Sequence, residues 1–245
     1  MKSFLQKTVI GVAVALLAVV VFWNNLTATA FWGLALHQTS ELSSVTTTPG
    51  TQLMLDEAGA TASSTSYGAL QIPHIFASTQ VLNETDTIVV FSDTASNAYY
   101  LISPMPTYRA NFLSDQTSRT QAEQAAMCEV LGQVYQAQPC QSDQVFVDTI
   151  MQVSTKTAGL FSNSQRKAAA ATFLLLKSTY LPQQTQQIAP FSTAAISGHL
   201  AIAPNQSVAY LFDQQAVGYE IAFINMNQEQ TQMILARIAE NTAKD

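Results

Sequence analysis

Basic residues are scarce in this chain of 245 residues, and its first half has almost none. Ten lysines and arginines stand against sixteen acidic residues, and no basic residue lies between Lys7 and Arg109. Without a basic cluster, the surface has little with which to neutralise a phosphate backbone or to attract anionic lipid. The shortage argues against nucleic-acid binding and against charge-driven binding to a membrane surface.

Side chains that perform catalysis or bind metals are also few. The three histidines, His37, His74 and His199, are far apart in the sequence, and no Gly-x-Ser-x-Gly elbow accompanies them. A Ser-His-Asp triad is recognised by its geometry, so one built on His74 or His199 stays open. A metal site needs three or four ligands at a usable spacing, and the two cysteines have no histidine nearby. We therefore assign no catalytic, cofactor-binding or metal-binding residue.

One short pattern suggests an enzyme, but the motifs that should accompany it are missing. Ser164-Gln165-Arg166-Lys167 has the Ser-x-x-Lys form of penicillin-interacting enzymes and opens an apolar segment. The nearest match to their Lys-Thr-Gly motif, Lys156–Gly159, is interrupted and precedes the serine. We interpret Ser162 or Ser164 as the N-cap of a helix.

The only long apolar run lies close to the N-terminus. Val9 to Trp23 contains no charge, Lys2 and Lys7 precede it, and all the acidic residues follow it. This asymmetry predicts a cytoplasmic stub over residues 1–7, a transmembrane signal-anchor over 8–26 and an exported remainder with a net charge of about −8. Ala28-Thr29-Ala30 has the form of a signal-peptidase site, so cleavage after Ala30 is the alternative.

The residues after the run divide into a tether and a domain. Residues 27–68 are rich in serine, threonine, alanine and glycine, a composition that buries little apolar area, so we expect a flexible tether. Leu53-Met54-Leu55 is a possible docking point within it. Residues 69–245 are long enough for one extracytoplasmic domain with its own core.

Changes of hydrophobic period predict an α+β fold for this domain. Two strand-like runs, 87–92 and 98–103, form an N-terminal hairpin, and a possible short strand precedes them at Val81-Leu82. About three central helices follow; the capping box Thr120–Glu123 opens the first, and Ser142 is a candidate N-cap for the second. The chain ends with a meander of strands and a final helix over 228–243. Strands, helices and then strands again favour an antiparallel sheet packed against helices.

The two cysteines, Cys128 and Cys140, are expected to form a structural disulfide. Exported proteins fold in oxidising surroundings, where pairs of cysteines tend to bridge. One continuous helix would hold the two α-carbons about 18 Å apart, beyond the reach of a disulfide. The helix must therefore end near Gly132–Gln136, and the chain must double back through Gln138-Pro139. No Cys-x-x-Cys redox motif is present.

These features predict a location better than an activity. We expect a single-pass protein of a bacterial inner membrane whose bulk is periplasmic and acts by binding an envelope protein. That partner would be basic, to suit the acidic surface, as in a secretion or envelope-assembly accessory factor or a toxin-immunity protein. The alternatives are an envelope hydrolase with an unassigned Ser/His site, and a carrier or sensor of small apolar ligands.

Overall fold

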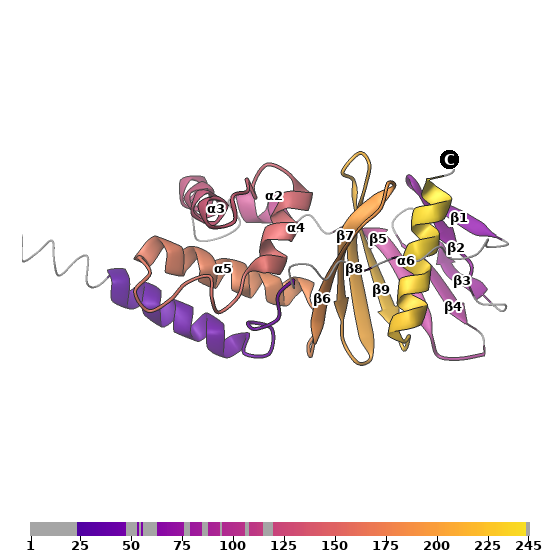
Figure 1. The fold of residues 1–245 in the computed structure, drawn as a ribbon, viewed down its shortest axis with the longest axis horizontal. Helices are drawn as coiled ribbons and strands as arrows, with labels where there is room; N and C mark the ends of the chain where they lie inside the picture. The colour runs from indigo at the N-terminus through magenta and orange to yellow at the C-terminus, as the bar shows by residue number, and fades with distance from the viewer. Residues whose placement is uncertain are drawn as a thin grey trace, which may run out of the picture.

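The chain folds as an α+β protein with antiparallel sheets, as predicted (Figure 1). This computed structural model describes residues 24–47, 53, 55, 63–75, 79–84, 88–93, 95–105, 108–114 and 120–243. A group of helices lies on one face of a seven-stranded sheet, and one helix with a two-stranded hairpin lies on the other (Figure 1). The sheet is thus the middle layer of three.

The helices on the first face form what we call the helical lobe. It comprises a helix over residues 24–38, the N-terminal helix, together with α2 (Tyr108–Leu113), α3 (Gln121–Tyr135), α4 (Asp143–Gln152) and α5 (Ser164–Tyr180). The predicted capping box opens α3: the Thr120 hydroxyl accepts from the Glu123 amide, and the Glu123 carboxylate accepts from the Thr120 amide. Ser142 caps α4, as expected.

The cap of α5 differs from the prediction. The side chain of Asn163 accepts a hydrogen bond from the Arg166 amide at 2.8 Å, so Asn163 is the N-cap in place of Ser162 or Ser164. Ser162 instead accepts from the Gly159 amide and closes the preceding turn. Asparagine is as good an N-cap as serine, and composition alone does not separate three adjacent polar residues.

The large sheet joins the predicted hairpin to the predicted meander. Its strand order is β3-β4-β5-β9-β8-β7-β6, and every neighbouring pair is antiparallel. The strands are β3 (Thr79–Glu84), β4 (Val89–Asp93), β5 (Tyr99–Pro104), β6 (Gln187–Ser192), β7 (Ile196–Ile202), β8 (Gln206–Asp213) and β9 (Gly218–Ile224). The pairing of β5 with β9 closes the sheet, although more than a hundred residues separate them in sequence. β6, which follows the turn after α5, was not predicted.

Both faces of the sheet are buried, so its central strands are apolar on both sides. Along β8, Tyr210 and Phe212 face the core of the helical lobe, whereas Ala209 and Leu211 face the opposite core. Strands covered on both faces lose the simple alternation of polar and apolar residues. This explains why the sequence of β8 reads as a continuous apolar run.

The third layer is built from residues 64–73 and the C-terminal helix. Helix α6 (Gln228–Thr242) packs against a hairpin of β1 (Ser64–Tyr67) and β2 (Leu70–Pro73), whose Leu70 and Ile72 are fully buried. The Thr242 hydroxyl accepts from the Gln71 amide at 3.2 Å. Residues 64–67, assigned by composition to the tether, are therefore part of a folded layer.

The first residues of the expected tether are also folded where they are described. The N-terminal helix buries Trp32 and Ala35 in the core of the helical lobe, and Leu42 follows them into it. The Leu53 amide donates to the Pro190 carbonyl oxygen at 2.8 Å, which places Leu53 against β6 as the docking point anticipated. A few apolar residues, such as Trp32 and Leu42, supply the buried area of this segment, although its average composition is polar and small.

The expected transmembrane segment falls almost entirely outside the described residues. Of residues 8–26, only 24–26 are described, and they are helical, as part of the N-terminal helix. Within the ranges given above, no helix combines the length and the apolar character needed to cross a membrane.

Candidate functional site

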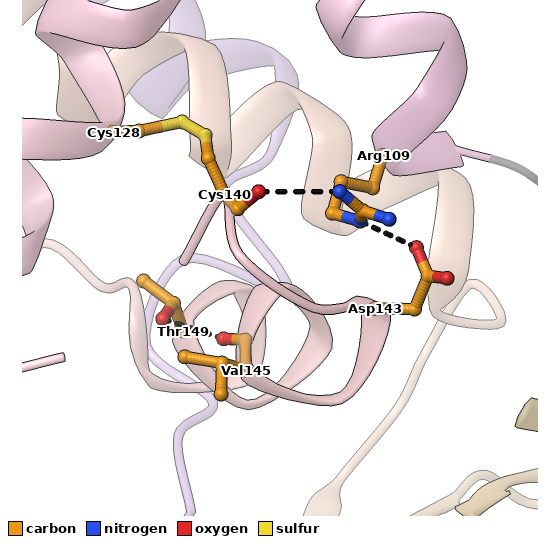
Figure 2. The surroundings of a disulfide bond; sticks show 6 residues. All are labelled: Arg109, Cys128, Cys140, Asp143, Val145 and Thr149. Atoms are coloured by element: carbon orange, nitrogen blue, oxygen red, sulfur yellow. Dashed lines mark hydrogen bonds and ion pairs between the residues drawn. A yellow bond between two sulfur atoms is a disulfide. The ribbon is translucent and has the colours of Figure 1, made fainter. Parts of the chain in front are cut away.

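The two cysteines meet at a corner of the helical lobe, as predicted. Cys128 on α3 is bonded to Cys140 in the turn before α4, with α-carbons 5.9 Å apart (Figure 2). Helix α3 ends at Tyr135, and Gln136 takes a left-handed conformation that lets the chain turn back. A Cβ atom on Gly132 would lie 2.5 Å from the Ala137 carbonyl oxygen, so this close reversal requires glycine.

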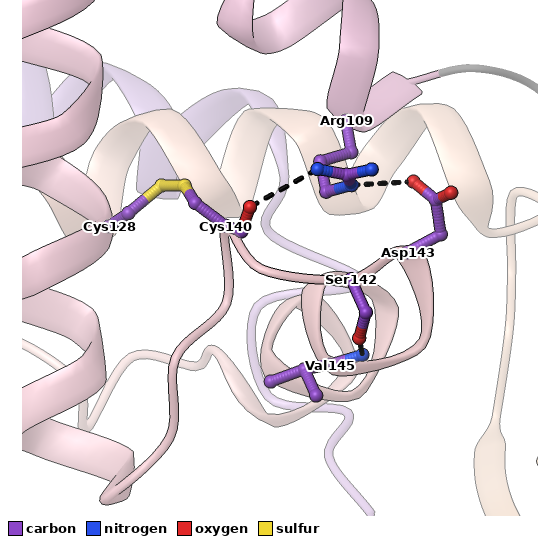
Figure 3. Close-up of polar contacts among 6 residues, drawn as sticks. All are labelled: Arg109, Cys128, Cys140, Ser142, Asp143 and Val145. Atoms are coloured by element: carbon purple, nitrogen blue, oxygen red, sulfur yellow. Dashed lines mark hydrogen bonds and ion pairs between the residues drawn. A yellow bond between two sulfur atoms is a disulfide. The ribbon is translucent and has the colours of Figure 1, made fainter. Parts of the chain in front are cut away.

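Arg109 braces the same corner from α2. Its Nη1 donates to the Cys140 carbonyl oxygen at 3.1 Å, and its Nε donates to the Asp143 carboxylate at 2.8 Å (Figure 3). Asp143 lies in the first turn of α4, where a carboxylate is favoured by the helix dipole. Both cysteines are consumed in the bond, so the arrangement is a structural brace.

Among the described residues, no histidine has a serine hydroxyl as a hydrogen-bonding partner. His199 on β7 is buried, and its Nε2 lies 2.6 Å from the Asp148 carboxylate on α4. Its Nδ1, which would have to accept the proton of a nucleophilic serine, has no hydrogen-bonding partner among the described residues. His74 lies elsewhere, on the β1–β2 hairpin side, with its Nε2 2.8 Å from the Thr65 hydroxyl. His37 is exposed on the N-terminal helix.

The Ser-x-x-Lys pattern also has a structural use. Lys167 is buried, and its ammonium donates to the Thr29 hydroxyl at 2.9 Å. The lysine therefore fastens α5 to the N-terminal helix. In the enzyme motif the lysine would interact with the serine, here Ser164; in this structure its hydrogen-bonding partner is Thr29.

A second lysine of α5, which the sequence analysis did not single out, is completely buried. The Lys177 ammonium donates to the carbonyl oxygens of Val45, Met151 at 3.0 Å and Val153 at 2.8 Å. Met151 and Val153 stand at the end of α4, where unpaired carbonyl groups attract a cation. Burial lowers the pKa of Lys177 to about 7, while the three acceptors match the three N–H groups of the charged form.

An apolar cleft beside α5 is too small for most ligands. Phe173 and Leu174 are fully buried in the core of the helical lobe, where Phe173 contacts Phe112 and Phe146 edge-on. Leu175 and Leu176 line a cleft of about 250 Å³, below the usual range of about 300–1,000 Å³ for small-molecule sites. The dense packing on one side of α5 argues against a carrier of apolar ligands.

The candidate site that the structure adds is a polar cleft of about 580 Å³, which we call the hydroxyl cleft. It lies between the segment that follows the N-terminal helix, the end of α3, the loop after α4 and the first turn of α5. Two cationic side chains and five hydroxyl groups line it: Lys156, Arg166, Thr46, Thr47, Tyr135, Ser154 and Thr157. Among the described residues, no acidic, histidine or cysteine side chain lines it.

A chain of hydrogen bonds fixes the floor of the hydroxyl cleft. The Thr157 hydroxyl accepts from the Ser154 amide at 2.9 Å and lies 2.7 Å from the Tyr135 hydroxyl, which reaches the Gln152 carbonyl oxygen at 3.2 Å. Tyr135 has one proton, and a carbonyl can only accept, so Tyr135 donates to Gln152 and accepts from Thr157. Burial raises the pKa of Tyr135, against the opposing effects of the Thr157 hydrogen bond and the Arg166 charge. The phenol therefore stays protonated, and the network stays intact, at neutral pH.

The two cationic side chains of the cleft, Arg166 and Lys156, have N–H groups that can donate to a ligand. Arg166 is held in place because its Nε donates to the Thr157 carbonyl oxygen at 2.6 Å, and its two Nη groups make no hydrogen bond to any described residue. Lys156, exposed on the rim, contributes an ammonium. A guanidinium held in one orientation, with both Nη groups pointing to the same side, is suited to bind a carboxylate or another planar anion through two hydrogen bonds. The hydroxyl cleft is thus equipped to bind an anionic group.

The sequence contained a partial signal for this site. Arg166-Lys167 is the densest basic spot of the chain after residue 26, and Lys156 lies ten positions before Arg166. Tyr135 and Thr46 join them only through the tertiary fold, so local pattern did not reveal the cleft.

No protein-family model, curated protein or solved structure matches this chain. Function is therefore inferred from the residues themselves.

Proposed function

We propose that this chain is a membrane-anchored extracytoplasmic protein that acts by binding another protein of the cell envelope. The observation behind the proposal is the chemistry of the hydroxyl cleft. Its lining combines the guanidinium of Arg166, the ammonium of Lys156 and several hydroxyl groups, all of which can form hydrogen bonds to a ligand. General acid–base and nucleophilic catalysis need a base beside the reacting group, most often histidine or a carboxylate, and the described lining provides neither.

The partner would present an acidic side chain or a C-terminal carboxylate to Arg166 and Lys156. The net charge of the exported region, about −8, would at the same time draw in a partner that is basic overall. Net charge governs the long-range approach, whereas the cleft would determine how the partner docks. A secretion or envelope-assembly factor and a toxin-immunity protein both meet this description.

Anchoring by residues 8–26 at a bacterial inner membrane, with the domain on the periplasmic side, is part of the proposal. The buried contacts of the N-terminal helix support it. Because Lys167 holds Thr29 and because Trp32 is buried, the domain begins directly after the apolar run. The domain would therefore be held close to the membrane, within reach of membrane-bound partners.

Site-specific photo-crosslinking in membranes tests the proposal. A photoreactive residue replaces Lys156 in the full-length chain, and a matched variant has it at Gln215, an exposed position in the turn between β8 and β9. We expect a specific crosslinked protein from position 156 and none from position 215. Arg166→Gln should abolish the crosslink. Because it also removes the hydrogen bond from Nε to the Thr157 carbonyl oxygen, a thermal unfolding curve checks that the variant is folded at the temperature of the experiment. Equal labelling from both positions, or no protein from position 156, would refute binding through the cleft.

A further inference from the structure

The turn that leads into α5 exposes two large apolar side chains. The Ser162 amide donates to the Gly159 carbonyl oxygen at 3.0 Å, and the Gly159 amide donates to the Ser162 hydroxyl at 2.9 Å. These two bonds close a tight turn whose central residues, Leu160 and Phe161, are 72% and 99% exposed. Turns usually have glycine, proline, asparagine, aspartate or serine in their centres. We refer to this element as the Leu160–Phe161 turn.

The Leu160–Phe161 turn lies at the end of the molecule where the apolar N-terminal run joins it. One residue after the turn, α5 begins at Ser164, which lines a shallow cleft with Asn24, the first described residue of the N-terminal helix. The two helices begin side by side at the left of Figure 1. Asn24 directly follows the run Val9–Trp23, and Leu26 beside it is 50% exposed.

We propose that the Leu160–Phe161 turn inserts into the lipid interface of the membrane that contains residues 9–23, as a second contact between domain and bilayer. The inference rests on the anchoring that the proposed function includes. A lipid surface fits better than a groove on a protein, because the apolar run must enter its membrane close to this turn. Aromatic and aliphatic side chains both gain from leaving water at such an interface.

The contact would be apolar in origin. The acidic exported region gives no reason to expect attraction to anionic lipid. Insertion should therefore occur in neutral phosphatidylcholine vesicles. The turn would also fix the tilt of the domain, since two separated contacts with a plane restrict rotation more than one does.

A fluorescent label at the turn tests the insertion directly. The native cysteines are bonded to each other, so Phe161→Cys supplies a single reactive thiol for an environment-sensitive nitrobenzoxadiazole label. The full-length chain is reconstituted into phosphatidylcholine vesicles. Val217→Cys is the matched control, because Val217 is an apolar side chain in a turn at the sheet and is 48% exposed.

We expect emission from position 161 to shift to shorter wavelength in vesicles and its reduction by external dithionite to slow several-fold. The label at position 217 should behave as in water. A third variant carries the label at Gln165→Cys, on the exposed first turn of α5. Its protection should be lost when Leu160→Ser and Phe161→Ser are added, which shows that the turn side chains drive the contact.

The outcomes separate this inference from the anchoring on which it depends. If the chain is washed from the vesicles by alkaline carbonate, the anchoring itself fails. If it stays anchored but the label at position 161 is as accessible as that at 217, only the insertion is refuted. A signal that requires added phosphatidylglycerol would overturn the apolar contact in favour of a charge-driven one.

Discussion

Lys177, near the C-terminal end of α5, donates a hydrogen bond to the carbonyl oxygen of Val45, which lies 132 positions earlier in the chain. The same ammonium also bonds the last carbonyl groups of α4. One buried side chain therefore adds polar bonds between three segments that also pack together in the core of the helical lobe. The first predictions concern this lysine.

Replacing Lys177 with methionine should destabilise the domain by about 2–4 kcal/mol. The methionine fills much of the volume but leaves three carbonyl oxygens without their donor, and an unsatisfied buried polar group costs about 1–3 kcal/mol. Chemical denaturation measures the change in the free energy of unfolding. Lys156→Met, at an exposed position, is the control and should change it little. A neutral or stabilising effect of Lys177→Met would show that the carbonyls find other donors.

The buried lysine should also make stability depend on pH. Folding lowers the pKa of Lys177 from 10.5 to about 7. Between these two values the unfolded chain binds a proton that the folded chain has lost, so the free energy of unfolding rises with pH. The slope is at most about 1.4 kcal/mol per pH unit. Denaturation curves from pH 7 to 9 should show the rise in the wild type and not in Lys177→Met; equal slopes would contradict it.

Removing the disulfide should cost about 3 kcal/mol, as expected for the closure of a short loop. The double variant Cys128→Ala/Cys140→Ala tests this in chemical denaturation. Arg109→Ala provides the contrast at the same corner (Figure 3), because its ion pair with Asp143 is partly exposed. Such pairs contribute about 0–1 kcal/mol. Thiol alkylation of the denatured, non-reduced wild type should find no free thiol, and two free thiols would refute the bond.

Gly198 should not tolerate a methyl group, whereas Gly159 should. A Cβ atom at Gly198 on β7 would lie 2.0 Å from the Tyr210 carbonyl oxygen and 2.9 Å from the Leu211 α-carbon. Both are backbone atoms of β8, so relief would require the two strands to separate. We expect Gly198→Ala to destabilise the domain by about 3 kcal/mol. Gly159→Ala meets nothing within 4 Å and should be neutral; thermal unfolding of both variants compares them.

Local signals in the sequence predicted the elements that depend on neighbours along the chain. The capping box at Thr120, the N-cap at Ser142 and the doubling back through Pro139 all follow from short-range chemistry, and the structure confirms each one. The antiparallel strands 98–103 and 219–225 were also recognised.

Elements that depend on distant partners were missed. Residues 64–67 become a strand because β2, which packs against α6, pairs with them, and their own sequence, STSY, is largely polar. Trp32 is buried only because α5 lies alongside the N-terminal helix. The hydroxyl cleft likewise unites Thr46 with Arg166 across most of the helical lobe. Hydrophobic period and composition describe one segment at a time. They therefore could not predict the strand at 64–67, the burial of Trp32 or the hydroxyl cleft.

The layered arrangement has a mechanical consequence. The N-terminal helix lies on one side of the sheet, and α6, which precedes the C-terminus, lies on the other (Figure 1). A pull between a membrane and a partner held near the C-terminus would cross the sheet from face to face. The load would fall on the contacts within the helical lobe, such as the Lys167–Thr29 hydrogen bond, and on the packing between layers before it reached the hydrogen bonds between strands. Under tension the helical lobe would separate first, and the seven-stranded sheet would remain whole.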